Sequence, residues 1–560
     1  MDRSVIFTEQ AEYIASDEFD RVLVEHPNEA ALLKKLTQGG AKLITGPRGC
    51  GKTTLMLKAY RQMLTDDSVL PIYVNFRRSL ALEPSYKSGP EGTYWFSQWI
   101  YLKLYQGLHE VFKDLGEEVR VTVTADNAAK WAGLLEMADL SSVPRFDFTM
   151  GQFEADIEAA LSSVNRRRCV LLLDDAAHAF SPEQQRDFFD FFRQVKTRSI
   201  SPKAAIYPGV TSYSSSFHVG HDAEELDVWF TPDNAGYLDF MRRLIEQRLP
   251  PEISEELLKD QEVANIICYG AFGIPRALIT MIQSVATLDE DDVDGEFKIS
   301  LNRAQAVRAV KSYYERVLVL FKSIKDKMPM YDNFIGNGLT VLENAFKSLK
   351  AYNESRDIGR QSAAIAINQG DMTHEFTRLF SLMQYAGLCV PKGEMSRGEG
   401  QKYRVFLLHY AGIVNWNAML GKRAVNVPDY NRAFNGQDFY QVVRIRGKVL
   451  TQNQSPEQLF QLALPPCPVC DAPRPNKDAR FCSNCGSPLK SLSSYLNLIG
   501  QDIEKLPLTA ARVKNIKQQS SIRTIKDILI DHEHRELMKV EMIGKVWASK
   551  IVAMAEEYVE

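Results

Sequence analysis

An octapeptide rich in glycine carries the clearest chemical signal in this sequence. Residues 46–53 read GPRGCGKT, which fits the spacing G-x-x-x-x-G-K-[ST]. Backbone N–H groups in such a turn wrap a phosphate, the lysine reaches the outer phosphates and the threonine hydroxyl holds Mg²⁺. The octapeptide lies between an apolar run and a helical pattern, as this chemistry requires, so an accidental glycine turn is rejected. The spacing predicts an ATP-binding loop made of Gly46, Pro47, Arg48, Gly49, Cys50, Gly51, Lys52, Thr53 and Thr54.

Two adjacent aspartates follow an uninterrupted apolar run, CVLLL at 169–173. Hydrolysis of ATP needs Mg²⁺ held opposite the phosphate loop and a group that orients water. We therefore predict that Asp174 binds Mg²⁺ together with Thr53 and that Asp175 orients the water. The alternative is that the two aspartates cap the next helix.

Four short apolar runs, separated by helical patterns, predict the fold class. Near-continuous apolar strands of this kind are typical of a parallel sheet covered by helices on both faces. We expect a multidomain α/β protein whose P-loop core spans residues 1–235, with strands at 41–45, 71–76, 169–173 and 204–211. After the fourth run, Thr211 or Ser212 is a candidate for contacting the terminal phosphate or the attacking water, the alternative being a turn residue.

The remaining patterns divide the chain further. Helical spacing near 78–165 indicates an insertion in the core, which is either a set of extra helices or a surface for a protein partner. A helical lid is expected at 236–300. Residues 301–422 contain a helix, a strand, a polar loop and a strand, which is the order of a winged helix. Residues 423–465 have mixed periodicity and predict a connector.

Four of the cysteines occur as two Cys-x2-Cys pairs. Each pair places two thiolates on one tight turn, and two such turns make a tetrahedral site for Zn²⁺. Disulfides and an iron–sulfur cluster are the alternatives. Four sulfurs leave no open position for water, so the metal would be structural. The pattern predicts a zinc ribbon at 466–490, a fold that contacts nucleic acid or docks proteins, with the ligands Cys467, Cys470, Cys482 and Cys485.

Residues 491–560 have helical patterns that resemble a helix-hairpin-helix unit, with Ile543 and Gly544 at the hairpin and Lys545 and Lys550 on the second helix. Such hairpins grip a DNA phosphate with backbone N–H groups and do not read sequence. The first of the two glycines usual in the hairpin is Met542 here. A basic run precedes the hairpin and is either a face that contacts DNA or a face that is only solvated. It consists of Arg512, Lys514, Lys517, Arg523 and Lys526.

Several of these segments together resemble a known family. GPRGCGKTT, LLLDDA, AAIYPGVTS and GIPRAL at 273–278 are similar to the Walker A, Walker B, sensor 1 and sensor 2 elements of AAA+ ATPases, in the same order. With the winged-helix pattern that follows, residues 30–420 resemble the origin-recognition and replication-initiator branch. The resemblance implies that Arg276 contacts the γ-phosphate from the lid, and that ATP controls an assembly on DNA. It also implies an arginine finger for a neighbouring subunit, for which Arg193 and Arg198 are candidates unless they only line a solvated helix.

Two functions remain open from the sequence. The first is an ATPase that engages DNA in replication, repair or defence against phage and other mobile elements, as a homo-oligomer or another ATP-dependent assembly. The second is a nucleotide-gated signalling switch in defence against phage, because paired aspartates such as Asp174 and Asp175 resemble those of STAND ATPases with slow turnover. A zinc module that only docks a protein partner is a third interpretation.

Composition limits the class of protein further. The net charge is −4, so any contact with nucleic acid has to come from local basic faces. The N-terminal residues lack a secretory signal, and no apolar stretch is long enough for a membrane span, which together predict a cytoplasmic protein. His218, His221 and Asp222 lack a well-spaced third partner for a metal and are expected to be polar loop residues.

Overall fold

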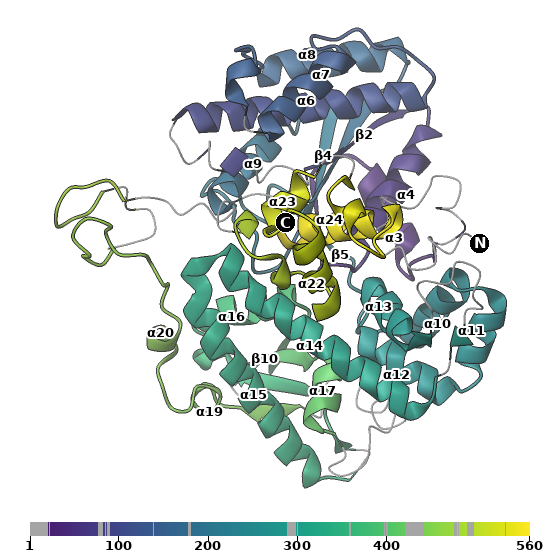
Figure 1. The fold of residues 1–560 in the computed structure, drawn as a ribbon, viewed down its shortest axis with the longest axis vertical. Coiled ribbons are helices and arrows are strands. Elements are labelled where there is room, and N and C mark those ends of the chain that lie inside the picture. The colour runs from purple at the N-terminus through teal and green to yellow at the C-terminus, as the bar shows by residue number, and fades with distance from the viewer. Residues whose placement is uncertain are drawn as a thin grey trace.

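The computed structural model (Figure 1) describes most of the chain in segments. Parts of the predicted insertion (77–81, 84–85 and 87–89), lid (288–297), polar loop (397, 399–400), connector (423–441), zinc ribbon and C-terminal unit (490–497) lie outside the described residues. The described residues are 19, 21, 23–76, 82–83, 86, 90–137, 139–176, 181–287, 298–299, 301–357, 360–396, 398, 401–419, 442–474, 479, 481–489, 498–531 and 534–559.

Five parallel strands form the core sheet in the order β2-β3-β4-β1-β5. The strands are β1 (Lys42–Thr45), β2 (Val69–Asn75), β3 (Arg168–Asp174), β4 (Ile200–Ile206) and β5 (Glu224–Asp227). The first four confirm the expected parallel sheet. β5 was not expected, because its sequence EELD is polar and buries one side chain, that of Leu226. Since the strands are parallel, the segments that follow β1, β3 and β4 meet at one edge of the sheet.

Helices cover this sheet and extend it at one end. α4 (Lys52–Leu64) starts directly at the glycine-rich loop, and α6 of the insertion packs so closely on β2 that a Cβ on Gly107 would lie 2.7 Å from the Tyr73 carbonyl oxygen. Figure 1 shows the insertion helices together at one end of the molecule. The other helices of this part are α3 (Glu29–Thr37), α6 (Pro90–Asp114), α7 (Ala125–Glu136), α8 (Met150–Ser163) and α9 (Pro182–Gln194).

A helical lid follows the core, as expected from the apolar periodicity past residue 235. Its last long helix begins at Pro275, a residue that suits the first turn of a helix because its missing N–H would have no partner there. The lid consists of α10 (Tyr237–Arg248), α11 (Pro251–Leu258), α12 (Gln261–Ala271) and α13 (Pro275–Val285), with the short pair β6 (Ala286–Thr287) and β7 (Lys298–Ile299).

The next part combines helices with a second sheet of order β11-β8-β10-β9. The expected order of helix, strand and strand is present as α16, β9 and β10. β11 lies in the segment expected to be a connector. It pairs in parallel with β8 and buries the side chains of Val443 and Ile445 in the core. The elements are α14 (Arg303–Lys327), α15 (Asp332–Glu354), β8 (Ala364–Asn368), α16 (His374–Tyr385), β9 (Cys389–Ser396), β10 (Lys402–Leu408), α17 (Tyr410–Trp416), β11 (Val443–Ile445), α19 (Gly447–Leu450) and α20 (Pro456–Leu459).

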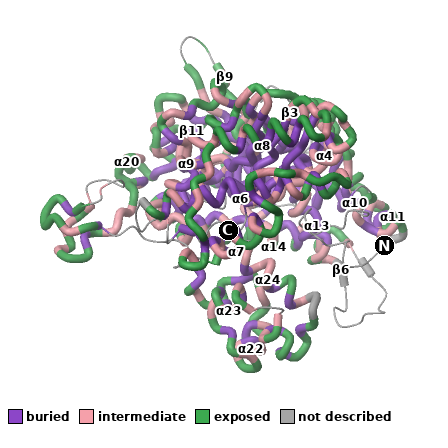
Figure 2. Tube along the Cα trace, turned by 90° about the horizontal axis from the view of Figure 1, so that it is seen from above, coloured by how far each residue is buried: buried purple, intermediate pink, exposed green. Residues whose placement is uncertain are grey.

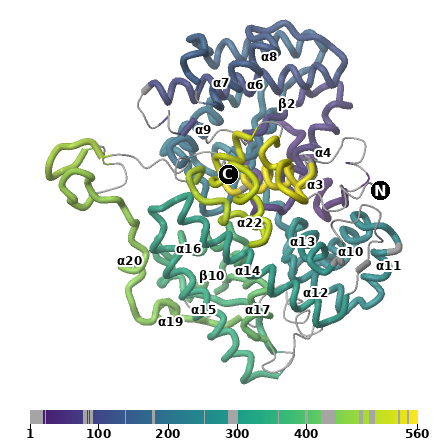
Figure 3. The backbone as a smooth tube through the Cα atoms, in the orientation of Figure 1, coloured from purple at the N-terminus to yellow at the C-terminus, as the bar shows by residue number. Residues whose placement is uncertain are grey.

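Three separate hydrophobic clusters divide the described residues. One continuous cluster unites the core, the lid and the second sheet. The cysteine pairs have a small cluster of their own, in a segment that projects beyond α20 (Figure 3). A third cluster holds α22 (Ala510–Gln519), α23 (Ile525–Leu529) and α24 (Lys545–Val559) in a lobe that stands off from the main body (Figure 2). No helix among the described residues has the length and apolar character needed to cross a membrane.

The turn after β4 is pressed against α16 of the second sheet's domain. Gly209 has a φ of 76°, and a Cβ added to it would lie 2.4 Å from the carbonyl carbon and oxygen of Ser381. A salt bridge of 2.6 Å between Lys392 of β9 and Asp233 adds a second contact between the two parts. The edge of the core sheet is therefore packed directly on the domain that contains α16.

We predict that Gly209→Ala destabilises the protein more than Gly220→Ala. Both glycines have positive φ values, but nothing lies within 4 Å of a Cβ at Gly220. The conformation alone costs about 1–2 kcal/mol in each variant, whereas forcing a methyl group onto α16 adds about 1–3 kcal/mol. Chemical unfolding of the two variants measures the difference. Equal losses of stability would show that the turn after β4 and α16 do not touch as described.

Candidate functional site

The glycine-rich loop has the backbone geometry that phosphate binding needs. Gly49 and Gly51 have φ values of 81° and 101°, which side chains rarely allow. At Gly49 a Cβ would also lie 2.9 Å from the Cβ of Arg276 on the lid. The loop thus leads from β1 into the N-terminus of α4, where backbone N–H groups and the helix dipole favour an anion.

Lys52 places its ammonium inside this loop. The side chain is 4% exposed, and Nζ donates to the carbonyl oxygens of Gly46 at 2.8 Å and Pro47 at 3.1 Å. Nζ also lies 3.6 Å from the ring centroid of Tyr207. Burial lowers the pKa of Lys52, while the nearby negative charges of Asp175 and Asp174 raise it. These groups offset part of the cost of burying the charge, and the pKa of Lys52 remains below its usual value.

The two predicted acidic residues have different surroundings. Asp174 ends β3 and is 1% exposed; its Oδ1 accepts from the backbone N–H of Asp175 at 3.0 Å and its Oδ2 from the Tyr73 hydroxyl at 3.0 Å. Asp175 has a φ of 55° and accepts from the Tyr207 hydroxyl at 3.1 Å. Of the two, Asp175 lines the pocket beside Lys52. Asp175 is therefore the carboxylate that faces the pocket, and Asp174 is buried outside its lining.

Thr211 does not line this pocket. Its hydroxyl donates to the Tyr207 carbonyl at 2.8 Å and accepts from the Tyr207 N–H at 3.0 Å, which closes the turn after β4. Ser212 donates its N–H to the Gln185 side chain at 2.6 Å. The residue from this turn that reaches the pocket is Tyr207, which directly follows β4 and was not among the predicted site residues. A hydroxyl-bearing side chain within the apolar run at 204–211 was the signal available in the sequence.

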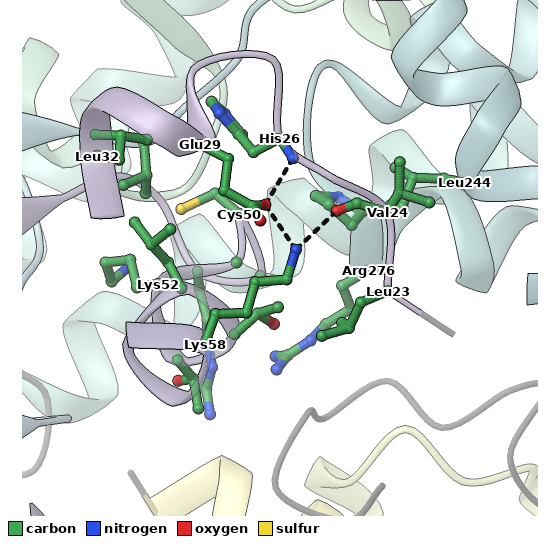
Figure 4. Close-up of a pocket in the computed structure, with 18 of the residues that line it drawn as sticks. Leu23, Val24, His26, Glu29, Leu32, Cys50, Lys52, Lys58, Leu244 and Arg276 are labelled. Atoms are coloured by element: carbon green, nitrogen blue, oxygen red, sulfur yellow. Dashed lines mark hydrogen bonds and ion pairs between the residues drawn. The ribbon is translucent and has the colours of Figure 1, made fainter. Parts of the chain in front are cut away.

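A pocket of about 140 Å³ lies between the core and the lid. Leu244 and Arg276 of the lid face Lys52 and Leu32 of the core across it (Figure 4). The lining contains charged side chains, among them Arg48, Lys52 and Arg276. It also contains apolar ones: Leu23, Val24, Leu32, Phe240, Leu244 and Ile279. Charged and apolar groups in one pocket are what a nucleotide needs for its phosphates and its base.

The wall formed by residues before α3 was not predicted. Glu29, the first residue of α3, holds this segment in place. Its Oε2 accepts from the backbone N–H of His26 at 2.8 Å and from Lys58 Nζ at 2.6 Å (Figure 4). Lys58 also donates to the Val24 carbonyl at 3.3 Å. This segment carries no motif, so only its position in the fold identifies it as part of the pocket.

The four paired cysteines come together as expected. Their Sγ atoms all lie within 4.8 Å of one another, and two Sγ pairs, Cys467 with Cys485 and Cys470 with Cys482, are 3.6 Å apart. Tetrahedral sulfur ligands on Zn²⁺ would be separated by about 3.8 Å. The hydroxyl of Ser487 lies 3.1 Å from Cys467 Sγ and helps to lower the pKa of Cys467 to about 6. The cluster therefore fits Zn²⁺, which would close the module around four thiolates.

Other predicted residues lie outside both sites. Arg193 and Arg198 are exposed near the end of α9. Asp222 accepts from the His218 N–H at 2.7 Å, and His221 Nδ1 lies 3.5 Å from Asp222 Oδ1. These histidines form a loop contact, and the four cysteines are the metal-ligating cluster found among the described residues.

In the C-terminal lobe, some residues of the predicted basic face have partners within the lobe. Lys517 is engaged by Asp502 and Glu504 at 2.7 Å each, so carboxylates distant in sequence neutralise it. The guanidinium of Arg512 lies 3.5 Å from the ring centroid of Trp547, and Lys550 Nζ lies 4.9 Å from the same ring. Met542 has a φ of 65°, a conformation for which glycine is the usual residue. The side chain of Lys545 lies outside the described residues.

Comparisons with known proteins give structural similarity alone. No protein-family model matches the chain, and no curated protein matches it. A Walker-type ATPase of Pyrococcus abyssi is similar over 70% of this chain and 96% of its own, with 10% identity and a TM-score of 0.38. The Aeropyrum pernix ORC1 protein, solved in complex with DNA, is similar over 74% and 96%, with 14% identity and a TM-score of 0.31. Cdc6p from Pyrobaculum aerophilum is similar over 74% and 98%, with 13% identity and a TM-score of 0.30. Function has to be argued from the residues of the sites.

We predict that the purified protein binds one Zn²⁺ per chain and that Cys467→Ser releases it. The loss of one thiolate opens the tetrahedral shell, so the module around the cysteines should unfold locally. The main thermal transition should be retained, because the core has a separate hydrophobic cluster. Elemental analysis and calorimetry measure both results, with Cys268→Ala as the control that keeps its Zn²⁺. Zinc retained by Cys467→Ser would contradict the assignment.

Proposed function

We propose that this protein binds and hydrolyses ATP and uses the bound nucleotide to control an assembly on DNA. The observation that carries the proposal is the meeting of Lys52, Asp175 and Arg276 in one pocket between core and lid. A phosphate loop supplies binding, a carboxylate can orient water, and a lid arginine can respond to the terminal phosphate. No such combination is needed to bind a small metabolite.

Mg²⁺ would neutralise charge on the phosphates. The Thr53 hydroxyl lines the pocket and would hold the ion, and the proposed second ligand is Asp174, which is buried outside the pocket lining. Lys52 and the loop N–H groups bind the outer phosphates, and Asp175 orients the attacking water. Arg276 is the second residue of the lid helix α13 and lies against Gly49. Contact between Arg276 and a γ-phosphate would draw the lid toward the core. The position of the lid relative to the core would therefore depend on which nucleotide is bound.

Three parts of the molecule supply candidate DNA contacts. α16, β9 and β10 have the order of a winged helix, and β10 carries Lys402 and Arg404. The cysteine module has the ligand set of a zinc ribbon. The C-terminal lobe presents Lys514, Lys526 and Lys550 as exposed cations, and Met542 at the proposed hairpin has a φ of 65°, which glycine usually adopts. Such contacts hold phosphates and do not read sequence.

The cellular setting remains part of the proposal. We infer a cytoplasmic protein that works in replication, repair or defence against mobile elements, as a homo-oligomer or another ATP-dependent assembly. Exposed Arg193 and Arg198 are candidates for reaching a neighbouring subunit, and the insertion or the zinc module is the candidate surface for a protein partner. The adjacent aspartates also fit a nucleotide-gated switch of the STAND type, which differs by holding ATP with negligible turnover.

We predict that Lys52→Ala weakens ATP binding by about 100-fold or more, because charge-assisted hydrogen bonds contribute about 1.5–3 kcal/mol each. Lys130→Ala, an exposed lysine on α7, should leave binding unchanged. Equilibrium titration with a fluorescent ATP analogue and a phosphate-release assay measure binding and turnover separately. ATP retained without turnover in the wild-type protein would favour the switch, and ATP binding unaffected by Lys52→Ala would refute the proposed site.

We predict that Lys526→Ala and Lys550→Ala each weaken DNA binding and reduce its dependence on salt by about one unit of slope per lost phosphate contact. Lys517→Ala is the matched control, because it changes the net charge equally but removes an ammonium already engaged by Asp502 and Glu504. Affinities for one duplex at several salt concentrations give the slopes. The same slope change in all three variants would indicate a general effect of charge and no DNA face on this lobe.

A further inference from the structure

Two tyrosines from the strands on either side of β3 each hold one of the adjacent aspartates. Tyr73 on β2 donates its hydroxyl to Asp174, and Tyr207 directly after β4 donates its hydroxyl to Asp175. Because β2, β3 and β4 are neighbours in the sheet, the arrangement follows from strand order. The two carboxylates are thus fixed separately.

The two tyrosines differ in whether they line the pocket. Tyr73 and Asp174 are absent from the lining of the pocket, whereas Tyr207 and Asp175 both line it. The ring of Tyr207 also covers Lys52 Nζ at 3.6 Å. Tyr207 is therefore the side chain that contacts both the acidic group and the cation that the proposed hydrolysis needs.

The position of Tyr207 is itself fixed from two directions. Thr211 holds its backbone through two hydrogen bonds of 3.0 and 2.8 Å. The ring of Tyr385, on α16, meets the Tyr207 ring edge-on with 5.9 Å between centroids. Burial raises the pKa of Tyr207 well above its usual value, so the hydroxyl stays protonated and remains a donor. A donor held in this way restricts the rotation of the Asp175 carboxylate.

We propose that Tyr207 is a positioning residue for ATP hydrolysis, which aims the Asp175 carboxylate at the attacking water and keeps Lys52 beside the phosphate loop. This inference rests on the proposed ATPase function. In the reaction the water oxygen bonds to the terminal phosphorus as the bond to the ADP oxygen breaks. One proton of the water stays on the released phosphate and the other passes to solvent. Tyr207 takes no part in these bond changes and acts through Asp175.

Tyr207→Phe tests the inference, because it removes the hydroxyl and keeps the ring over Lys52 and against Tyr385. We expect kcat to fall about tenfold, the effect of losing one hydrogen bond to a charged group. The KM and the Kd for ATP should stay within about twofold, because the contacts of the ring with Lys52 remain. Steady-state and single-turnover hydrolysis, with a separate binding titration, measure the three quantities.

Tyr105→Phe is the matched control. The Tyr105 hydroxyl donates to buried Asp156 at 2.5 Å, in the helical insertion away from the pocket. The control variant loses a hydrogen bond of the same kind, so it should lower stability without changing kcat. Unfolding measurements on both variants correct the hydrolysis rates for the fraction of folded protein.

The results separate this inference from the function on which it rests. Wild-type protein that fails to bind or hydrolyse ATP would overturn the proposed function and the inference with it. Wild-type turnover that is unchanged in Tyr207→Phe would overturn the inference alone. A tenfold fall in kcat that also appears in Tyr105→Phe, or an equal loss of ATP affinity, would show a structural role for Tyr207 in place of positioning.

Discussion

The buried ammonium of Lys52 is the interaction on which the rest of the site depends. A buried cation is tolerated only where other groups replace the water that it loses. Here the loop carbonyls, the Tyr207 ring and the charges of Asp174 and Asp175 do so, and they come from three different strand ends. Only parallel strands bring those ends to one edge of a sheet. The adjacency of β3, β4 and β1 in the sheet is therefore what brings these groups to the charge of Lys52.

The same edge also joins the pocket to the remainder of the main body. The turn that follows Tyr207 is pressed on α16 at Gly209, and Tyr207 itself touches Tyr385 of that helix. On the other side, Gly49 allows Arg276 of the lid to approach the loop. Closely packed elements shift as units because interiors have few voids. A nucleotide that displaces Tyr207 or Arg276 would thus act on α16 and on the lid through direct contacts.

Local features were predictable from the sequence and long-range ones were not. The phosphate loop, the cysteine pairs and the apolar strands each lie within a few consecutive residues, so their spacing carries the information. The role of Tyr207 was missed because it depends on contacts with Lys52 and Asp175, which are distant in sequence. The wall around Glu29 has no motif, β5 is polar, and Lys517 is neutralised by carboxylates outside the basic run. Such features depend on tertiary contacts, which one sequence does not reveal by pattern.

The separation of hydrophobic clusters limits how a bound nucleotide could act on the other parts of the molecule. One continuous cluster connects the pocket with α16, β9 and β10, whereas the cysteine module and the C-terminal lobe have cores of their own. Direct packing contacts can transmit a change in the lid through a continuous cluster. Under the proposed function, the domain with α16 is therefore placed to respond to the nucleotide state. The two separate modules would instead add phosphate contacts of constant strength, which would raise affinity through effective concentration.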